Sequence, residues 1–204
     1  MTEQEALPVG PAVETGDAAR AEIYLLLGTL LAGPPDTGVL ELLQEIDAGD
    51  PNASPMAATW QAVQAAAKDT DVSRLGDEYF SLFIGLGRGE LLPYASFYIH
   101  GFLMEKVLAS LRSELQRLGF ELQDGISEPE DHVAALCETM GMIISESGLS
   151  FEQQAAFYEA YIANWMPDFF ADLGEAESAH FYKSVAVLGQ QFMEIEAQYL
   201  AMQA

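Results

Sequence analysis

Residues 97–118 read FYIHGFLMEKVLASLRSELQRL, and the spacing of their apolar side chains decides the fold class. Apolar or small residues recur here at intervals of four and three, from Phe97 to Leu118, and charged residues such as Arg112 fall between them. This is the period of an amphipathic helix whose apolar stripe faces a core. We therefore expect one helix over the whole segment, ended by Gly119.

The same period continues on both sides of this segment and predicts an all-α bundle of about seven or eight helices. Pro167 lies inside a later stripe and should kink or end that helix. Capping boxes fit at Ser127–Glu130 and Ser150–Gln153, so helices are expected to begin there. No alternating strand pattern, hairpin signal or internal repeat is found. The expected helices are Ala18–Leu31, Gly38–Ile46, Pro55–Lys68, Val72–Phe83, the 97–118 segment, one that begins at Ser127 and carries the stripe Val133–Ile143, Phe151–Phe169 and Phe181–Met202.

We expect a single all-helical domain over residues 18–204, with irregular segments near 84–94 and 120–129. Residues 1–17 are expected to form a loose tail. They are not expected to be a signal peptide, because they lack its basic start and apolar run. The longest apolar stretch, residues 23–32, is shorter than the roughly 20 residues that span a bilayer. The lone Cys137 allows no internal disulfide and fits a reducing compartment. The sequence therefore predicts a soluble, cytoplasmic protein.

The charge of the chain restricts its partners. Eight Lys and Arg oppose 32 Asp and Glu, so the formal net charge is −24. Such a surface repels the phosphates of nucleic acids and anionic lipid headgroups, which argues against nucleic acid and against stable membrane insertion. A basic peptide is a natural partner for it. The alternative is that the acidity only keeps the protein in solution.

The motifs that would support an enzyme or a metal site are weak. The turn Gly85–Gly89 reads GLGRG, which has neither the spacing of a dinucleotide loop nor the Lys-Ser or Lys-Thr ending of a P-loop. The three histidines have no ligand spacing, and a single Glu-x-x-His pair at Glu177–His180 does not make a di-iron site. No Gly-x-Ser-x-Gly elbow is present. The sequence therefore predicts a protein that is not an enzyme and holds no metal or cofactor, with a weak nucleotide hydrolase as the alternative.

The segment Glu128–His132 reads EPEDH and has two interpretations. Acidic residues at a helix start interact favourably with the helix dipole, so the segment can be structural. Alternatively, Asp131 and His132 face outward from the first turn and contact a partner, with His132 charged by its acidic neighbours and sensitive to pH.

Three blocks of sequence resemble the TorD family, of the TorD, DmsD and NarJ type. Residues 78–98 read EYFSLFIGLGRGELLPYASFY and are similar to the family's aromatic-Leu-Phe helix end, glycine turn and P-x-x-S-x-Y. The EPEDH segment is similar to its E-P-x-D-H signature. Residues 157–173 are similar to its third block and keep Trp165, but Tyr161 replaces a common histidine and Asn164 a common proline. These departures put any role of that histidine in doubt and suggest a divergent subgroup.

The resemblance implies a cytoplasmic chaperone of redox-enzyme maturation. Such chaperones bind the twin-arginine leader peptide, the mature part of a molybdopterin-containing oxidoreductase catalytic subunit, or both, and hold it for cofactor insertion before Tat export or membrane assembly. Some members are associated with weak guanine-nucleotide binding and with domain-swapped dimers, so monomer and swapped dimer both stay open. A generic acidic helical adaptor is the remaining alternative. The residues expected to bind the client are Tyr79, Tyr94, Ser96, Tyr98, Glu128, Pro129, Glu130, Asp131, His132 and Trp165.

Overall fold

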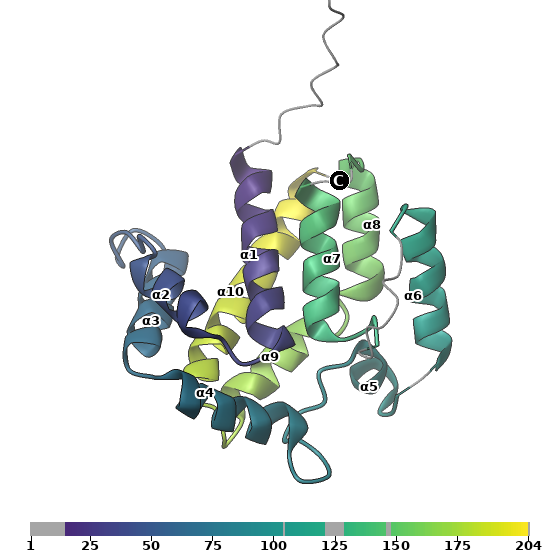
Figure 1. Cartoon of the computed structure of the whole chain (residues 1–204). Helices are drawn as coiled ribbons and strands as arrows, with labels where there is room; N and C mark the ends of the chain where they lie inside the picture. The colour runs from purple at the N-terminus through teal and green to yellow at the C-terminus, as the bar shows by residue number, and fades with distance from the viewer. Residues whose placement is uncertain (1–14, 104, 121–128, 146–147, 204) are drawn as a thin grey trace, which may run out of the picture.

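The computed structural model describes residues 15–103, 105–120, 129–145 and 148–203, and these form a bundle of helices (Figure 1). Within these ranges no strand occurs, and the isolated pairing of extended backbone is one antiparallel bridge between Tyr94 and His132. The all-α prediction is therefore confirmed. The helices are α1 (Thr15–Ala32), α2 (Thr37–Glu45), α3 (Pro55–Lys68), α4 (Val72–Tyr79), the π-helix η1 (Phe80–Ile84), α5 (Ala95–His100), α6 (Glu105–Arg117), α7 (Val133–Ser145), α8 (Phe151–Tyr161), α9 (Met166–Glu175) and α10 (Phe181–Gln203).

Ten α-helices in the described ranges exceed the expected seven or eight, because two expected helices are each divided. Gly101 adopts a left-handed backbone with φ of 80°, which ends α5 at His100 and separates it from α6. Pro167 lies in the first turn of α9, where its missing N–H costs nothing, and α8 ends before it as expected.

The centre of the bundle is an antiparallel pair formed by α1 and α7 (Figure 1). Gly28 of α1 lies against Glu138, and Gly141 of α7 lies against Leu25, so neither glycine leaves room for a side chain. Helix α1 buries Ala21, Tyr24, Leu27, Leu30 and Leu31 in the bundle, whereas Leu25 stays partly exposed.

Helix α10 runs antiparallel to α1 and is attached to it near both ends. Near one end, the Tyr182 hydroxyl donates to the Leu30 carbonyl over 2.8 Å. Near the other, the Arg20 guanidinium donates two hydrogen bonds of 2.7 Å to the buried carboxylate of Glu196. Burial opposes the charge on Arg20, but the bonds to Glu196 and Asp17 raise its pKa further above the ordinary value. Arg20 is therefore held as a buried, paired cation.

Two predicted boundaries are wrong. Helix α1 begins at Thr15, so residues 15–17 belong to it and not to a loose tail; residues 1–14 lie outside the described residues. Helix α7 begins at Val133 and not near Ser127, which also lies outside them. The capping box at Ser150 and Gln153 is confirmed at the start of α8.

Across the described ranges, no helix combines the length and the apolar character that a membrane span requires.

Candidate functional site

The two most specific sequence motifs meet in space, although about 35 residues separate them. Residues 93–98 and residues 129–133, which we call the motif junction, are joined by backbone hydrogen bonds on both sides of the Tyr94–His132 bridge. The Ala95 N–H donates to the Asp131 carbonyl over 3.0 Å, and the Val133 N–H donates to the Pro93 carbonyl over 2.9 Å. The junction therefore fixes the start of α5 to the start of α7.

Asp131 caps α5 from a distant part of the chain. The residue before α5, Tyr94, has no side-chain capping bond, and an Asp131 carboxylate oxygen accepts from the Ser96 N–H over 3.0 Å instead. Asp131 is only 1% exposed. A carboxylate at this position satisfies a helix N–H that would otherwise be buried without an acceptor.

His132 caps α7 from the position directly before that helix. Its Nδ1 accepts from the Ala134 N–H over 3.2 Å, and its ring meets the Tyr94 ring edge-on with centroids 5.2 Å apart. This contact holds the His132 ring against the first turn of α7. The expectation that Asp131 and His132 face outward is wrong, because both side chains are buried.

Glu130 lies outside α7 and pairs with α6. Its Oε1 accepts from the Arg112 Nε over 2.7 Å. This hydrogen bond lowers the pKa of Glu130, although burial partly opposes the shift. Glu130 therefore attaches α6 to the junction; the capping box expected with Ser127 lies outside the described residues. Pro129 is half-buried and its carbonyl accepts from the His132 N–H, whereas Glu128 lies outside the described residues.

An aromatic cluster joins α5 to α9 beside the junction. The Tyr98 ring lies 5.6 Å from the Trp165 ring and 6.0 Å from the Phe169 ring. The Tyr98 hydroxyl donates to Asp172 over 3.0 Å, and burial followed by this contact raises its pKa above the ordinary value. Trp165 is 1% exposed and donates to the Tyr161 carbonyl over 2.7 Å. Of this cluster, Tyr98 reaches the surface and Trp165 supports it from below.

Tyr79 belongs to the core and not to the junction. It is buried, its hydroxyl donates to the Leu31 carbonyl over 3.2 Å, and its ring packs against Phe83 and Tyr182. Ser96 is also buried, and its hydroxyl oxygen has no hydrogen-bond partner in the described structure.

The glycine turn after η1 is closed on itself. Gly85 has φ of 61°, and a side chain there would collide with the Arg88 backbone, as one on Gly89 would with Leu82 and Phe83. Leu86 at the tip is 98% exposed. The turn therefore has no cradle of the kind that a phosphate-binding loop needs.

Two carboxylates on either side of this turn bind the connection between α9 and α10, and neither was predicted from the sequence. Glu78 is buried and accepts from the N–H groups of His180, Phe181 and Tyr182 over 2.7–3.1 Å, which caps α10. Glu90 accepts from the N–H groups of Glu177 and Ser178 over 2.6 and 3.0 Å. Glu78 is a charged residue within an otherwise apolar helical stripe. This pattern was the sequence signal that could have indicated a buried, bonded carboxylate.

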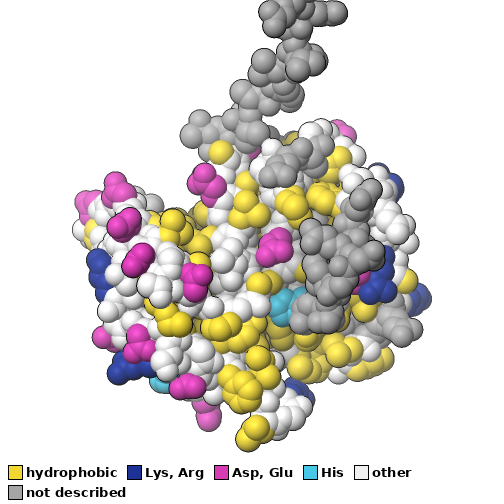
Figure 2. Space-filling model, in the orientation of Figure 1, with side chains coloured by type: hydrophobic (Ala, Val, Ile, Leu, Met, Phe, Trp, Pro, Cys, Tyr) yellow, Lys and Arg dark blue, Asp and Glu magenta, His cyan; other side chains and the backbone are white. Residues whose placement is uncertain are grey.

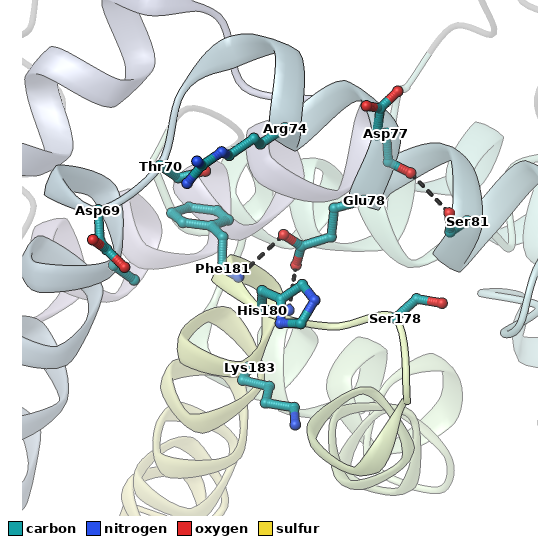
Figure 3. Close-up of a pocket in the computed structure, with 11 residues that line it drawn as sticks. Asp69, Thr70, Arg74, Asp77, Glu78, Ser81, Ser178, His180, Phe181 and Lys183 are labelled. Carbon is teal, nitrogen blue, oxygen red and sulfur yellow. Dashed lines mark hydrogen bonds between the residues drawn. The ribbon is translucent and has the colours of Figure 1, made fainter.

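A cavity lies beside the Glu78 cap (Figure 3). Its volume is about 780 Å³, and it opens between the end of α3, α4 and the start of α10. Figure 3 shows Arg74 and Lys183 on opposite sides of it, with the Glu78 carboxylate directed at the α10 backbone between them. No residue of the Gly85–Gly89 turn lines this cavity. The turn and the cavity therefore do not combine into the nucleotide site that the alternative function would need.

A second, smaller cavity lies beside the motif junction. Its volume is about 340 Å³, and α5, α6 and α8 form its walls, with Ile99, Val107 and Tyr161 among the lining side chains. Phe102 and Leu103 follow α5 in the chain and are 61% and 57% exposed. We call Ile99, Phe102 and Leu103 the apolar edge. Figure 2 shows hydrophobic side chains gathered along the lower part of this face, over the segment from η1 to α5.

Comparison with known proteins gives one family and one fold. The model of the family described as "Nitrate reductase delta subunit" matches residues 50–171. The protein named chaperone protein TorD from Vibrio parahaemolyticus is 27% identical to this chain, and the match covers 92% of this chain and 97% of that protein. The protein of the same name from Shewanella loihica is 26% identical, and the match covers 89% of this chain and 93% of that protein. The match to the one in Vibrio atlanticus, at 28% identity, spans 64% of that protein.

A crystal structure from Archaeoglobus fulgidus, described as that of a redox enzyme maturation protein, has the same fold. It superposes with a TM-score of 0.57 over 95% of this chain and 99% of that one, at 20% identity. At this identity the likeness concerns the fold alone.

Proposed function

The chain belongs to the nitrate reductase delta subunit family as a TorD-type chaperone, and on that premise we propose that it matures a molybdopterin-containing oxidoreductase in the cytoplasm. In this proposal it binds the twin-arginine leader peptide of the catalytic subunit, its mature part, or both. It holds the enzyme while the cofactor is inserted and releases it for Tat export or membrane assembly. The chaperone itself uses no cofactor and performs no chemical step.

The observation that carries this proposal is the family match over residues 50–171, which contains the whole motif junction. The junction is built from buried capping bonds, such as that from the Ser96 N–H to Asp131, which suit a rigid support better than a reactive centre. What it supports is the exposed apolar edge on α5 and the segment after it. Binding surfaces are often placed on such rigid scaffolds.

The charge of the chain supports a basic client. A net charge of −24 attracts a peptide that begins with arginines, and the apolar edge offers contacts to an apolar stretch. Charge-assisted hydrogen bonds from arginine to carboxylate are stronger than neutral hydrogen bonds. The carboxylate also holds the planar guanidinium in a defined geometry. The acidic charge fits the arginines of a twin-arginine leader, and the apolar edge fits its apolar stretch.

The test is calorimetric titration of the purified chain with a synthetic twin-arginine leader. We expect binding that weakens as salt is raised, because exposed ion pairs are screened over about 8 Å at physiological ionic strength. A residual affinity should remain at high salt, since apolar contacts are not screened. A control peptide with two glutamines in place of the arginines should bind more weakly and with less dependence on salt. No heat of binding for any leader of the host's molybdoenzymes would exclude the leader and leave the mature enzyme as the partner.

A further inference from the structure

We propose that the apolar edge and two carboxylates of α9 form one docking surface that binds the client peptide in a single direction, with its arginines at α9 and its apolar stretch along α5 and α6. This rests on the proposed function, which names the peptide but not where or in which direction it lies. The surface is distinct from the buried residues of the EPEDH segment.

The apolar part of the surface is formed by the edge and by the adjoining cavity. Ile99 belongs to both: it is exposed and lines the cavity of about 340 Å³ between α5, α6 and α8. Phe102 and Leu103 extend the apolar surface beyond α5. Large apolar side chains that are exposed close together typically mark an interaction site, whereas single ones do not. An apolar segment bound here would cover Ile99 at the cavity and continue along the chain over Phe102 and Leu103.

The acidic part lies on the neighbouring face of α5. Tyr98 precedes Ile99, and consecutive residues of a helix point about 100° apart, so Tyr98 faces α9 while Ile99 faces the cavity. The Tyr98 hydroxyl donates to Asp172, and the charge of Asp168 also acts on it. Asp168 and Asp172 are exposed and one helical turn apart, which places their side chains about 5–6 Å from each other at Cβ. Two adjacent arginines can therefore each meet one carboxylate.

The remaining charges around the apolar edge fix the direction. Lys106 lines the cavity, and the Arg88 guanidinium lies over the Phe97 ring at 5.6 Å from its centroid. Positive charge on these sides repels a basic end of a peptide, while the α9 side attracts it. The arginines therefore lie at Asp168 and Asp172, and the apolar stretch that follows them runs past Ile99 toward α6.

The experiment measures the affinity of a fluorescent synthetic leader for three double variants of the full chain, by anisotropy at low and high salt. Asp168→Asn with Asp172→Asn should weaken binding about tenfold at low salt and flatten the salt dependence, since two exposed ion pairs are lost. Phe102→Ser with Leu103→Ser should weaken binding at both salt concentrations and leave the salt dependence intact. The matched control is Glu41→Gln with Glu45→Gln, an exposed pair with the same spacing on α2, which should change affinity by less than about twofold.

Direction is tested by photo-crosslinking, with the reactive group placed next to the arginines in one peptide and at the far end of the apolar stretch in another. We expect the first to label α9 and the second to label α5 or α6, as read by mass spectrometry. If the α9 variant binds like the wild type with an unchanged salt dependence, or if the labels are reversed, the inference is wrong. If the wild type binds no leader at all, the leader part of the proposed function fails first.

Discussion

Replacing Asp131 should reveal whether the EPEDH segment supports the fold or contacts the client. The Asp131 carboxylate accepts the Ser96 N–H over 3.0 Å in a buried setting. Asp131→Ala leaves that N–H without an acceptor and without water. A buried unsatisfied donor costs about 1–3 kcal/mol. Asp131→Asn keeps an acceptor oxygen but loses the charge, which roughly halves the strength of the bond. We therefore expect a stability order of wild type, then Asn, then Ala.

The assay is urea unfolding followed by far-UV circular dichroism, with leader affinity measured on the same samples. The matched control is Asp36→Ala, which removes the exposed cap of α2 formed between Asp36 and the Val39 N–H over 2.9 Å. Water can replace that exposed acceptor, so Asp36→Ala should cost less than Asp131→Ala. For a chain of this length, a loss of 1 kcal/mol lowers the melting temperature by about 2–4 °C.

Binding decides between the two roles of Asp131. If it positions α5, Asp131→Asn should bind the leader nearly as well as the wild type. Asp131→Ala should lose affinity only to the extent that α5 is destabilised. An Asp131→Ala variant that unfolds at the wild-type urea concentration but no longer binds would refute the reasoning and make Asp131 a contact residue.

Three further predictions concern groups outside the junction. Arg20→Met should lower the free energy of unfolding by about 3–5 kcal/mol because it leaves the Glu196 carboxylate buried and unpaired, and adding Glu196→Leu should restore most of the loss in the same urea assay. Glu90→Gln should be less stable than the wild type at neutral pH. Burial opposes ionisation of Glu90, but its bonds to Ser178 and Glu177 lower its pKa below 4.5. The difference in stability between wild type and variant should therefore persist above pH 4.5 and vanish as the pH falls through the lowered pKa. A difference in stability that does not depend on pH would contradict this. Burial raises the pKa of the Cys137 thiol, so a thiol reagent should label it only on unfolding, and rapid labelling of the native chain would show that α7 opens.

The helices that sequence alone predicts best are those whose apolar period is unbroken. The bounds of α3 are as expected, and α10 begins at the expected Phe181. The division between α5 and α6 was not predicted, because Gly101 fits the apolar stripe as a small residue and only its left-handed backbone ends the helix. Periodicity reports which face is buried, but not where a glycine leaves the helical conformation.

The two motifs of the candidate site were found in the sequence, but their contact with each other was not predicted. The outward orientation expected of Asp131 came from placing it in the first turn of a helix that begins later, at Val133. The Asp131 carboxylate bonds to the Ser96 N–H, 35 residues away, and no local pattern contains that contact. The same holds for Glu78, whose partners begin at His180. Capping by distant carboxylates is a property of the assembled bundle.

The most direct test of the proposed chaperone function is affinity capture of the full-length chain from its native host, followed by identification of the bound protein by mass spectrometry. The account predicts enrichment of the catalytic subunit of a molybdopterin-containing oxidoreductase, recovered with its twin-arginine leader still uncleaved. Capture should fall with the Asp168→Asn and Asp172→Asn variant and persist with the Glu41→Gln and Glu45→Gln control. Repeated capture of partners that include no such oxidoreductase would contradict the account and favour a generic acidic adaptor.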